Sequence, residues 1–124
     1  MNIESHRLDA EHYTLKENEA HKINRAMQSD KRVITVGTTA TRVLEHSFNN
    51  GMVEHGGGFT DLFIYPAYSF KIVNTLITNF HMPRSTPYLL TSAFGGTGLI
   101  KEAYRYAITH QFKFFSYGDA MMIL

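Results

Sequence analysis

The chain lacks cysteine and tryptophan, and only three of its 124 residues are proline. Without cysteine it can form no disulfide bond and no thiolate zinc site, and it has no cysteine nucleophile. An excess of either charge is also missing, since 12 Lys and Arg stand against 11 Asp and Glu. The net charge of +1 does not favour a protein that coats nucleic acid through bulk positive charge.

Long hydrophobic runs are absent as well. The longest stretch without a formal charge, residues 85–100, contains Pro87, three glycines and several hydroxyl residues, so it does not suit a membrane-spanning helix. The first twelve residues, MNIESHRLDAEH, lack the apolar centre of a signal peptide. We therefore expect no membrane segment, and the cytoplasm is the default compartment for a chain without cysteine.

What the chain does contain is the composition of a folded domain. Hydrophobic residues make up 44% and charged residues 19%, and the length predicts one domain, 1–124, with a buried core. Residues 1–32 carry 12 of the 23 formal charges, whereas residues 56–100 carry only Asp61, Lys71 and Arg84. The first third is therefore expected to be exposed and the middle to be mostly buried.

Hydrophobic periodicity and turn residues predict an α/β fold. Thr14 and Glu17 have the spacing of a capping box before a first helix, and residues 52–58 are expected to form a loop. Helices are predicted at 15–29, 38–50, 86–95 and 99–110, and strands at 32–36, 62–65, 70–73, 75–80, 112–115 and 121–124, with 75–80 also compatible with a helix. This alternation favours a mostly parallel sheet with helices on both faces, a three-layer arrangement.

Ligands of such sheets bind at the carboxyl ends of the strands, which directs attention to two segments. Gly37, Thr38 and Thr39 join a strand to a helix that carries Arg42 in its first turns. The free N–H groups of that helix and the guanidinium could bind a carboxylate or phosphate. The alternative is that Thr38 or Thr39 simply caps the helix.

The second segment, residues 78–85, places Asn79, His81 and Arg84 in one turn. Histidine can transfer protons near neutral pH, and arginine can clamp an anion with two hydrogen bonds, although a hydrogen-bonded turn histidine beside a surface arginine explains the pattern too. Asp119 could act as a general base or accept from a ribose hydroxyl, or it could be a turn residue. The seven histidines do not have metal-ligand spacing, so no metal site is expected.

Four segments carry a resemblance to a known family. They are VITVGTTATRVLE (33–45), TDLFIYPAYSFKIVNTLITNFHMPRST (60–86), SAFGG (92–96) and FFSYGDAMMI (114–123). In this order they resemble the C-terminal third of the S-adenosylmethionine:tRNA ribosyltransferase-isomerases of queuosine biosynthesis. The resemblance implies a C-terminal fragment of a longer α/β enzyme, without the β-barrel that the family inserts.

The resemblance also implies a reaction. Family members transfer the ribosyl part of S-adenosylmethionine to 7-aminomethyl-7-deazaguanine in tRNAs with a GUN anticodon and rearrange it, which yields epoxyqueuosine and releases adenine and methionine. S-adenosylmethionine is then a substrate and no metal takes part. The residues expected in catalysis are His81 and Asp119; those expected to bind substrate are Gly37, Thr38, Thr39, Arg42, Asn79 and Arg84.

The chain departs from the family at several positions. A stretch similar to Met-His-Ser-Glu is replaced by Leu8-Asp9-Ala10-Glu11, the usual glycine between Pro66 and Tyr68 is Ala67, and Arg84 replaces a common lysine. A stand-alone nucleotide- or tRNA-binding module and a divergent inactive paralogue are therefore alternatives. The full-length protein is expected to be a monomer, whereas the fragment is expected to be inactive alone and able to self-associate through uncovered apolar surface.

Overall fold

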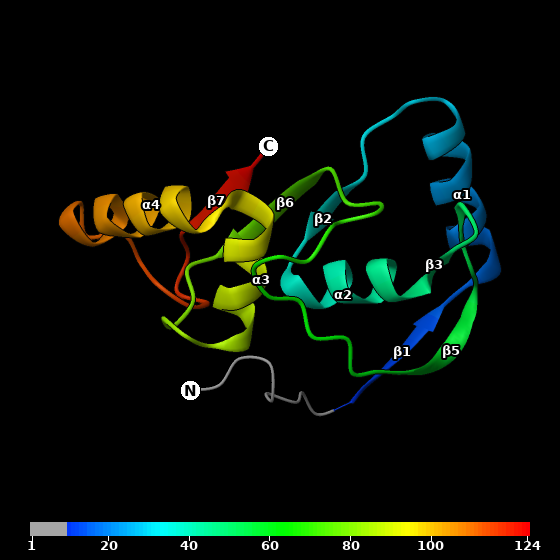
Figure 1. Cartoon of the computed structure of the whole chain (residues 1–124), viewed down its shortest axis with the longest axis horizontal. Helices are drawn as coiled ribbons and strands as arrows, with labels where there is room; N and C mark the ends of the chain where they lie inside the picture. The colour runs from blue at the N-terminus through cyan, green and yellow to red at the C-terminus, as the bar shows by residue number, and fades with distance from the viewer. Residues whose placement is uncertain (1–9) are drawn as a thin grey trace.

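The computed structural model describes residues 10–124 (Figure 1). Four helices and seven strands follow one another within these residues. Their order is β1 (Glu11–Leu15), α1 (Glu17–Gln28), β2 (Ile34–Val36), α2 (Thr38–Ser47), β3 (Phe48–Asn49), β4 (Met52–Val53), β5 (Gly56–Thr60), β6 (Thr75–Asn79), α3 (Thr86–Gly95), α4 (Thr97–Thr109) and β7 (Ala120–Ile123).

The largest sheet has three strands in the order β2-β6-β7. β2 pairs with β6 in parallel, with Val36 opposite Ile77, and β6 pairs with β7 in antiparallel fashion, with Ile77 opposite Met122. The α/β class and the strand at 75–80 are confirmed. The prediction of a mostly parallel sheet is wrong, because the sheet is mixed and the two smaller sheets are antiparallel.

Helices cover one face of this sheet. On that face Leu76 and Ile123 belong to a buried cluster with Leu90 of α3 and Ile100 of α4. α2 lies against β2, where the hydroxyl groups of Thr35 and Thr41 are 2.7 Å apart. The other face exposes Ile34, Val36 and Met122. The three-layer prediction is therefore wrong for the part of the chain that the structure describes.

A separate two-stranded ribbon is formed by β1 and β5. β1 pairs with β5 over the whole length of both, so the expected loop at 52–58 is wrong: it contains β4 and the start of β5. The glycine-rich run of β5 has low intrinsic strand propensity, and pairing with β1 overrides it. Thr14 lies in β1 and Lys16 precedes α1 without a side-chain cap, so the capping-box prediction is wrong too.

Residues 61–74 contain no regular helix or strand. The strands predicted at 62–65 and 70–73 are wrong because side chains of α2, rather than a neighbouring strand, bind their backbone groups. The carbonyl of Leu62 accepts from Arg42, and the N–H groups of Ile72 and Val73 donate to Glu45.

The C-terminal part agrees better with the sequence. Ser85 caps α3 by accepting from the N–H of Tyr88 at 3.3 Å, and α4 follows as predicted. The strand expected at 112–115 is wrong, since Gln111 and Phe115 have φ values of 59° and these residues form turns. β7 confirms the last strand.

Two hydrophobic clusters form the interior. The larger contains Leu76, Phe80 and Tyr104, the smaller joins α1 to the segment before β6, and Phe70 and Phe94 pack against both.

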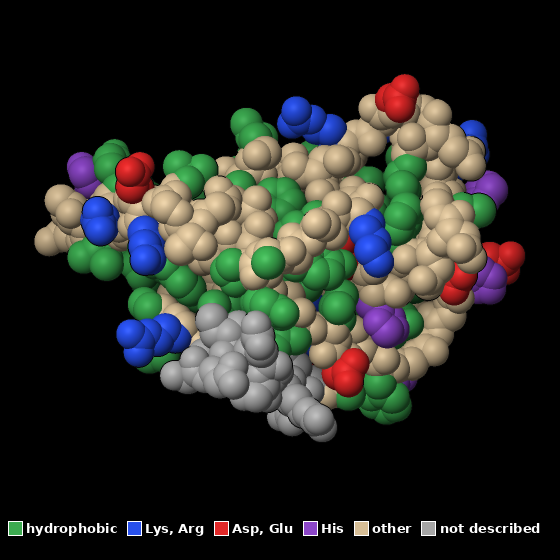
Figure 2. Space-filling model, viewed as in Figure 1, with side chains coloured by type: hydrophobic (Ala, Val, Ile, Leu, Met, Phe, Trp, Pro, Cys, Tyr) green, Lys and Arg blue, Asp and Glu red, His purple; other side chains and the backbone are tan. Residues whose placement is uncertain are grey.

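Figure 2 shows that charged side chains lie mainly around the rim of the face drawn there. No helix within residues 10–124 has the length and apolarity needed to cross a membrane.

Candidate active site at the carboxyl ends of two parallel strands

The parallel pairing of β2 and β6 brings two of the predicted site segments to the same end of the sheet, where both strands have their carboxyl ends. Gly37 directly follows β2, and its N–H donates to the carbonyl of Ile77 at 2.8 Å. Its φ of 96° suits glycine and turns the chain into α2. The carboxyl end of β6, with Asn79, therefore lies beside the first turn of α2.

Among the residues that the structure describes, no side chain caps the N-terminus of α2. Gly37 occupies the N-cap position, so the alternative that Thr38 or Thr39 caps the helix is wrong. Thr41 sits one turn further and donates its hydroxyl to the carbonyl of Gly37 at 3.0 Å. The first N–H groups of α2 thus remain available for an anionic or carbonyl group.

His81 lies just beyond β6 and is fixed on two sides. Its Nε2 is 2.7 Å from the hydroxyl of Thr78, and its backbone N–H donates to the hydroxyl of Tyr104 at 2.7 Å. Tyr104 is buried in α4, where its ring packs edge-on against Phe80. Contact with Thr78 leaves Nδ1 as the ring nitrogen that can face a ligand.

Burial controls the ionisation of these two groups. The half-buried imidazole of His81 has a pKa below its usual 6.5 because desolvation disfavours the charged form. Burial likewise raises the pKa of Tyr104, against the opposing effect of its hydrogen bond with the His81 backbone. His81 is therefore neutral at pH 7, which is the state that can accept a proton.

The backbone carbonyl of Asp119 contacts Asn79 at the carboxyl end of β6. Asn79 donates its side-chain amide to the Asp119 carbonyl at 3.1 Å, while the Asp119 carboxylate accepts from the N–H of Lys113. The structure therefore brings Asn79 and Asp119 together. The carboxylate itself holds the turn before β7, as the turn interpretation predicts.

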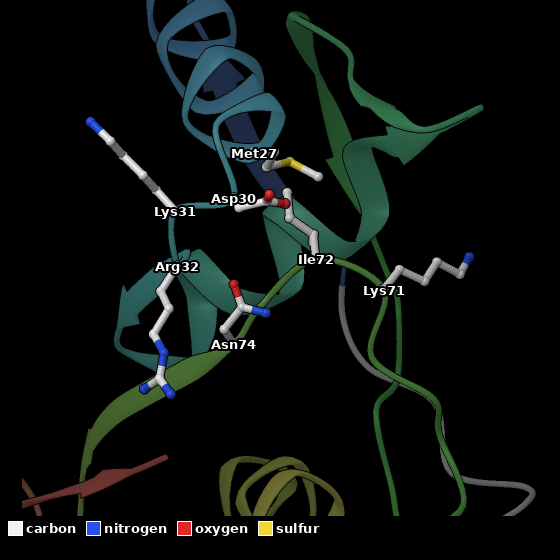
Figure 3. A pocket seen from close by; sticks show the side chains of 7 residues that line it. All are labelled: Met27, Asp30, Lys31, Arg32, Lys71, Ile72 and Asn74. Atoms are coloured by element: carbon white, nitrogen blue, oxygen red, sulfur yellow. The ribbon is translucent and has the colours of Figure 1, made fainter.

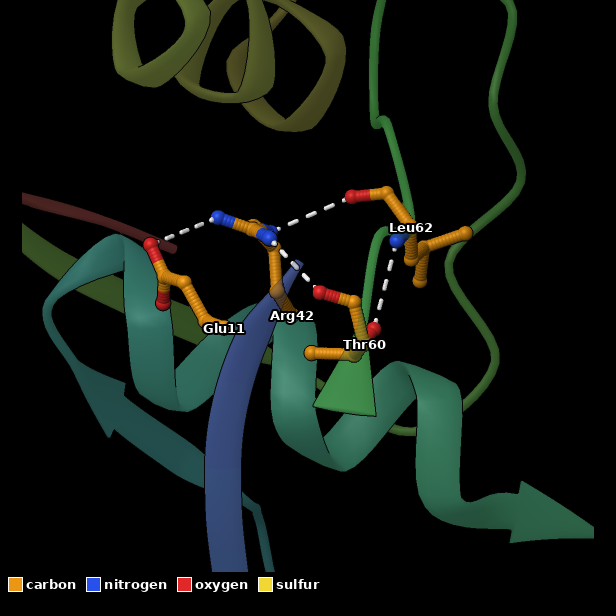
Figure 4. Close-up of polar contacts among 4 residues, drawn as sticks. All are labelled: Glu11, Arg42, Thr60 and Leu62. Carbon is orange, nitrogen blue, oxygen red and sulfur yellow. Dashed lines mark hydrogen bonds and ion pairs between the residues drawn. The ribbon is translucent and has the colours of Figure 1, made fainter. Parts of the chain in front are cut away.

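The two arginines of the predicted site have different surroundings. Arg84 is exposed with a φ of 67°, and it forms no ion pair within the described part of the chain. Arg42 is only 6% exposed. It donates to the carbonyls of Leu62 and Thr60 at 3.1 and 3.3 Å and pairs with Glu11 at 3.1 Å (Figure 4). Arg42 thus fastens α2 to the β1–β5 ribbon, so its guanidinium is already engaged by the protein.

Glu45 is a polar residue that sequence reasoning missed. Its carboxylate is buried and accepts from the N–H groups of Lys71, Ile72 and Val73 and from the hydroxyl of Tyr68, at 2.8–3.1 Å. Burial and the nearby carboxylate raise the pKa of Tyr68. The sequence does carry one sign of its burial: Glu45 follows Thr41 by four residues, which places both on one face of α2.

A hollow of about 450 Å³ lies at the opposite end of the strands, next to the turn between α1 and β2. Its lining includes Lys31, Arg32 and Lys71 together with Asp30. Figure 3 shows the three cationic side chains pointing in different directions, so they do not converge on one bound anion. No group of three metal-ligating side chains occurs among residues 10–124.

Comparison with known proteins places the whole chain in one family. A family model described as queuosine biosynthesis protein matches residues 1–123. The chain belongs to this family. It is 53% identical over 123 residues to an S-adenosylmethionine:tRNA ribosyltransferase-isomerase of Natranaerobius thermophilus, and 49% identical over 123 residues to one of Acetivibrio thermocellus.

A solved structure of this family has the same fold. The S-adenosylmethionine tRNA ribosyltransferase of Thermotoga maritima matches with a TM-score of 0.86 and 43% identity over 91% of this chain. The match covers 40% of that structure, and the chain spans 36% of the length of the two relatives above. The prediction that the chain corresponds to about a third of a family member is confirmed. Of the departures noted above, Leu8 and Asp9 lie outside the described residues.

Proposed function

We propose that this chain supplies part of the active site of a tRNA-modifying transferase-isomerase. In the reaction, the ribosyl moiety of S-adenosylmethionine is moved onto 7-aminomethyl-7-deazaguanine in tRNA with a GUN anticodon and rearranged to give epoxyqueuosine. The observation that carries the proposal is the position of His81 in a chain of this family. It is fixed by Thr78 and Tyr104 just beyond the carboxyl end of β6, and the parallel partner of β6, β2, leads into the uncapped N-terminus of α2.

His81 is proposed as the acid–base residue. The sulfonium of S-adenosylmethionine acidifies the protons on the adjoining ribose carbon, so the reaction needs a base that is unprotonated near pH 7. When Nε2–H of His81 donates to the Thr78 hydroxyl, the lone pair of Nδ1 is free to take such a proton. The lowered pKa of His81 keeps the imidazole in that form.

The remaining residues are proposed to hold substrate. The N–H groups after Gly37, at Thr38 and Thr39, suit the methionine carboxylate, and the exposed Arg84 suits that carboxylate or a tRNA phosphate. Asn79 and Asp119 are proposed to orient the ribose, with Asp119 as a second base. For Arg42 we propose a positioning role, because all three of its donor nitrogens bind the protein.

The test is release of adenine from S-adenosylmethionine in the presence of precursor tRNA. A chimera in which this chain replaces the matching segment of the Natranaerobius relative should turn over, and His81→Ala should abolish turnover in it. Thr109→Ala, an exposed change at the far end of α4, is the control and should leave turnover intact. Unchanged turnover after His81→Ala would remove His81 from the mechanism, and turnover by the isolated chain would refute its proposed dependence on further segments.

A binding experiment separates this proposal from a stand-alone binding module. Calorimetry of the isolated chain with S-adenosylmethionine and with tRNA should show at most weak heat, because this chain is proposed to supply only part of the site. Tight binding of either ligand by the isolated chain would favour the binding-module alternative instead.

A further inference from the structure

The uncovered face of the β2-β6-β7 sheet is an apolar surface contributed by all three strands. Side chains alternate along a strand, so the residues next to Thr35 and Leu76 in the sequence point away from the helices. On that side Val36 lies beside Ile77, and Ile77 beside Met122. Val36 is 71% exposed, Met122 60% and Ile34 55%.

This surface differs from scattered exposed hydrophobic residues. The strand residues that point to it carry no formal charge: they are Ile34, Val36, Ile77, Asn79, Ala120 and Met122, while Thr75 on the same side is buried. Contiguous exposed apolar area without charged residues marks an interaction surface. Parallel strands such as β2 and β6 are moreover normally buried on both faces.

The sheet is also open at its sides. Within residues 10–124, β2 and β7 each have a strand partner on one side only, so each presents a free edge. A partner that covers the face can therefore also extend the sheet.

The family match indicates which polypeptide would cover this face. The same fold, at a TM-score of 0.86, makes up 40% of the Thermotoga structure, and the chain spans 36% of its two relatives. Most of a family member is thus polypeptide without a counterpart in this chain, and the third layer of an α/β unit must come from there.

We infer that the face formed by Ile34, Val36, Ile77 and Met122 is the docking surface for the polypeptide that makes up the remainder of a family member. Docking completes the missing layer of the sheet. The inference rests on family membership and the bare sheet, and it does not depend on the proposed reaction.

The absence of cysteine from the chain allows a direct test with introduced thiols. Val36→Cys and Met122→Cys report on the face, and Ile108→Cys, at an α4 position that is 65% exposed, is the matched control. Each introduced cysteine is labelled with a maleimide in the isolated chain and in the chimera with the Natranaerobius relative. Mass spectrometry of the labelled peptides distinguishes the introduced cysteines from any cysteines of the relative.

In the isolated chain all three thiols should react at similar rates. In the chimera, labelling at positions 36 and 122 should slow by about 100-fold, since it then requires local opening, while position 108 keeps its rate. Equal rates at position 36 in both proteins would overturn the inference, and so would equal slowing at all three positions.

Two further outcomes are diagnostic. Slow, concentration-dependent labelling of position 36 in the isolated chain, with a dimer in light scattering, would show that the uncovered face self-associates; it would overturn the inference if position 36 also reacted as fast in the chimera as in the diluted monomer. Should the chimera fail to fold, co-expression of this chain with the uncovered part of the relative decides: co-purification should occur, be lost with Val36→Lys and persist with Ile108→Lys. No co-purification with the unchanged chain would overturn the inference.

Discussion

Glu45 shows how much one buried side chain can organise. Its carboxylate receives three backbone N–H groups and the Tyr68 hydroxyl, all charge-assisted hydrogen bonds in a site without bulk water. Glu45→Gln keeps the shape but replaces an oxygen with an NH₂ group that faces donors.

We expect Glu45→Gln to lower the free energy of unfolding by about 2 kcal/mol. Urea denaturation followed by circular dichroism measures it. Glu102→Gln, on the exposed side of α4, is the control and should change little. An equally small effect at Glu45 would mean that the carboxylate is dispensable for the path of residues 68–73.

Ala67 occupies a backbone conformation that glycine adopts more easily. The N–H of Tyr68 donates to the carbonyl of Tyr65 at 3.0 Å, which closes a turn with Pro66 second and Ala67 third, and the φ of Ala67 is 95°. Such a turn favours glycine at its third position.

Ala67→Gly should therefore raise the free energy of unfolding by about 1 kcal/mol, since it removes the steric cost of the Cβ. The melting temperature in differential scanning calorimetry reports it. Ala40→Gly, at an exposed position of α2 with ordinary helical geometry, should act in the opposite direction. Destabilisation at both positions would show that residue 67 does not need a positive φ.

His81 contributes to stability in a pH-dependent way. Its folded-state pKa lies below 6.5, so above pH 6.5 the folded and unfolded states are both neutral and the contribution is complete. As the pH falls below 6.5 the unfolded state binds the proton first, and stability is lost until the pH reaches the folded-state pKa.

His81→Gln should consequently flatten the dependence of stability on pH below 6.5. Urea midpoints measured between pH 5 and 7 follow this change, and the imidazole resonance that the substitution removes should titrate below 6.5 in the unchanged chain. An unaltered slope together with titration at or above 6.5 would contradict the assigned burial effect. His110→Gln, at an exposed position, controls for the loss of an imidazole as such.

At the scale of elements, α2 is joined to the β1–β5 ribbon by Arg42 rather than by hydrophobic contact alone. Three nitrogens of its guanidinium serve two backbone carbonyls and Glu11. A lysine ammonium at this position retains the charge but cannot reach these acceptors in one plane.

Arg42→Lys should lower the free energy of unfolding by about 2 kcal/mol and should speed amide exchange in β5 more than in β6. Hydrogen exchange with mass spectrometry resolves the two strands. The exposed Arg105→Lys is the matched control. Uniform acceleration across β5 and β6 would contradict a local role in holding the ribbon.

Local signals predicted some elements and failed for others for identifiable reasons. Ser85 with a following proline predicted α3, and the β-branched run before Gly37 predicted β2, because both depend on neighbouring residues. The path of residues 61–74 depends on contacts with Arg42 and Glu45 that span 20 to 28 positions, and hydrophobic runs there imitate strands. At the site, strand order predicted that Gly37 and Asn79 share an edge, whereas the contacts of Thr78 and Tyr104 with His81 required the tertiary structure.

At the scale of the whole molecule, the bare sheet face should govern behaviour in solution. Val36→Thr combined with Met122→Gln should reduce the fluorescence of a dye that binds apolar surface, and should change the free energy of unfolding by no more than about 0.5 kcal/mol because both side chains are already exposed. Ile108→Thr is the control, and dye binding that falls equally there would locate the apolar surface elsewhere.

Arg42 and Glu45 lie one turn apart on α2, and between them they hold both ends of the irregular stretch from Thr60 to Val73. The arginine takes its carbonyls and the glutamate takes its N–H groups, so both recognise backbone that every amino acid shares. The helix therefore fixes the path of this stretch through its backbone, while Ile64, Ile72 and Val73 are buried in the core. At its exposed positions, such as Asp61, Ser69 and Lys71, the segment can change in sequence without moving the strand, β6, that delivers His81.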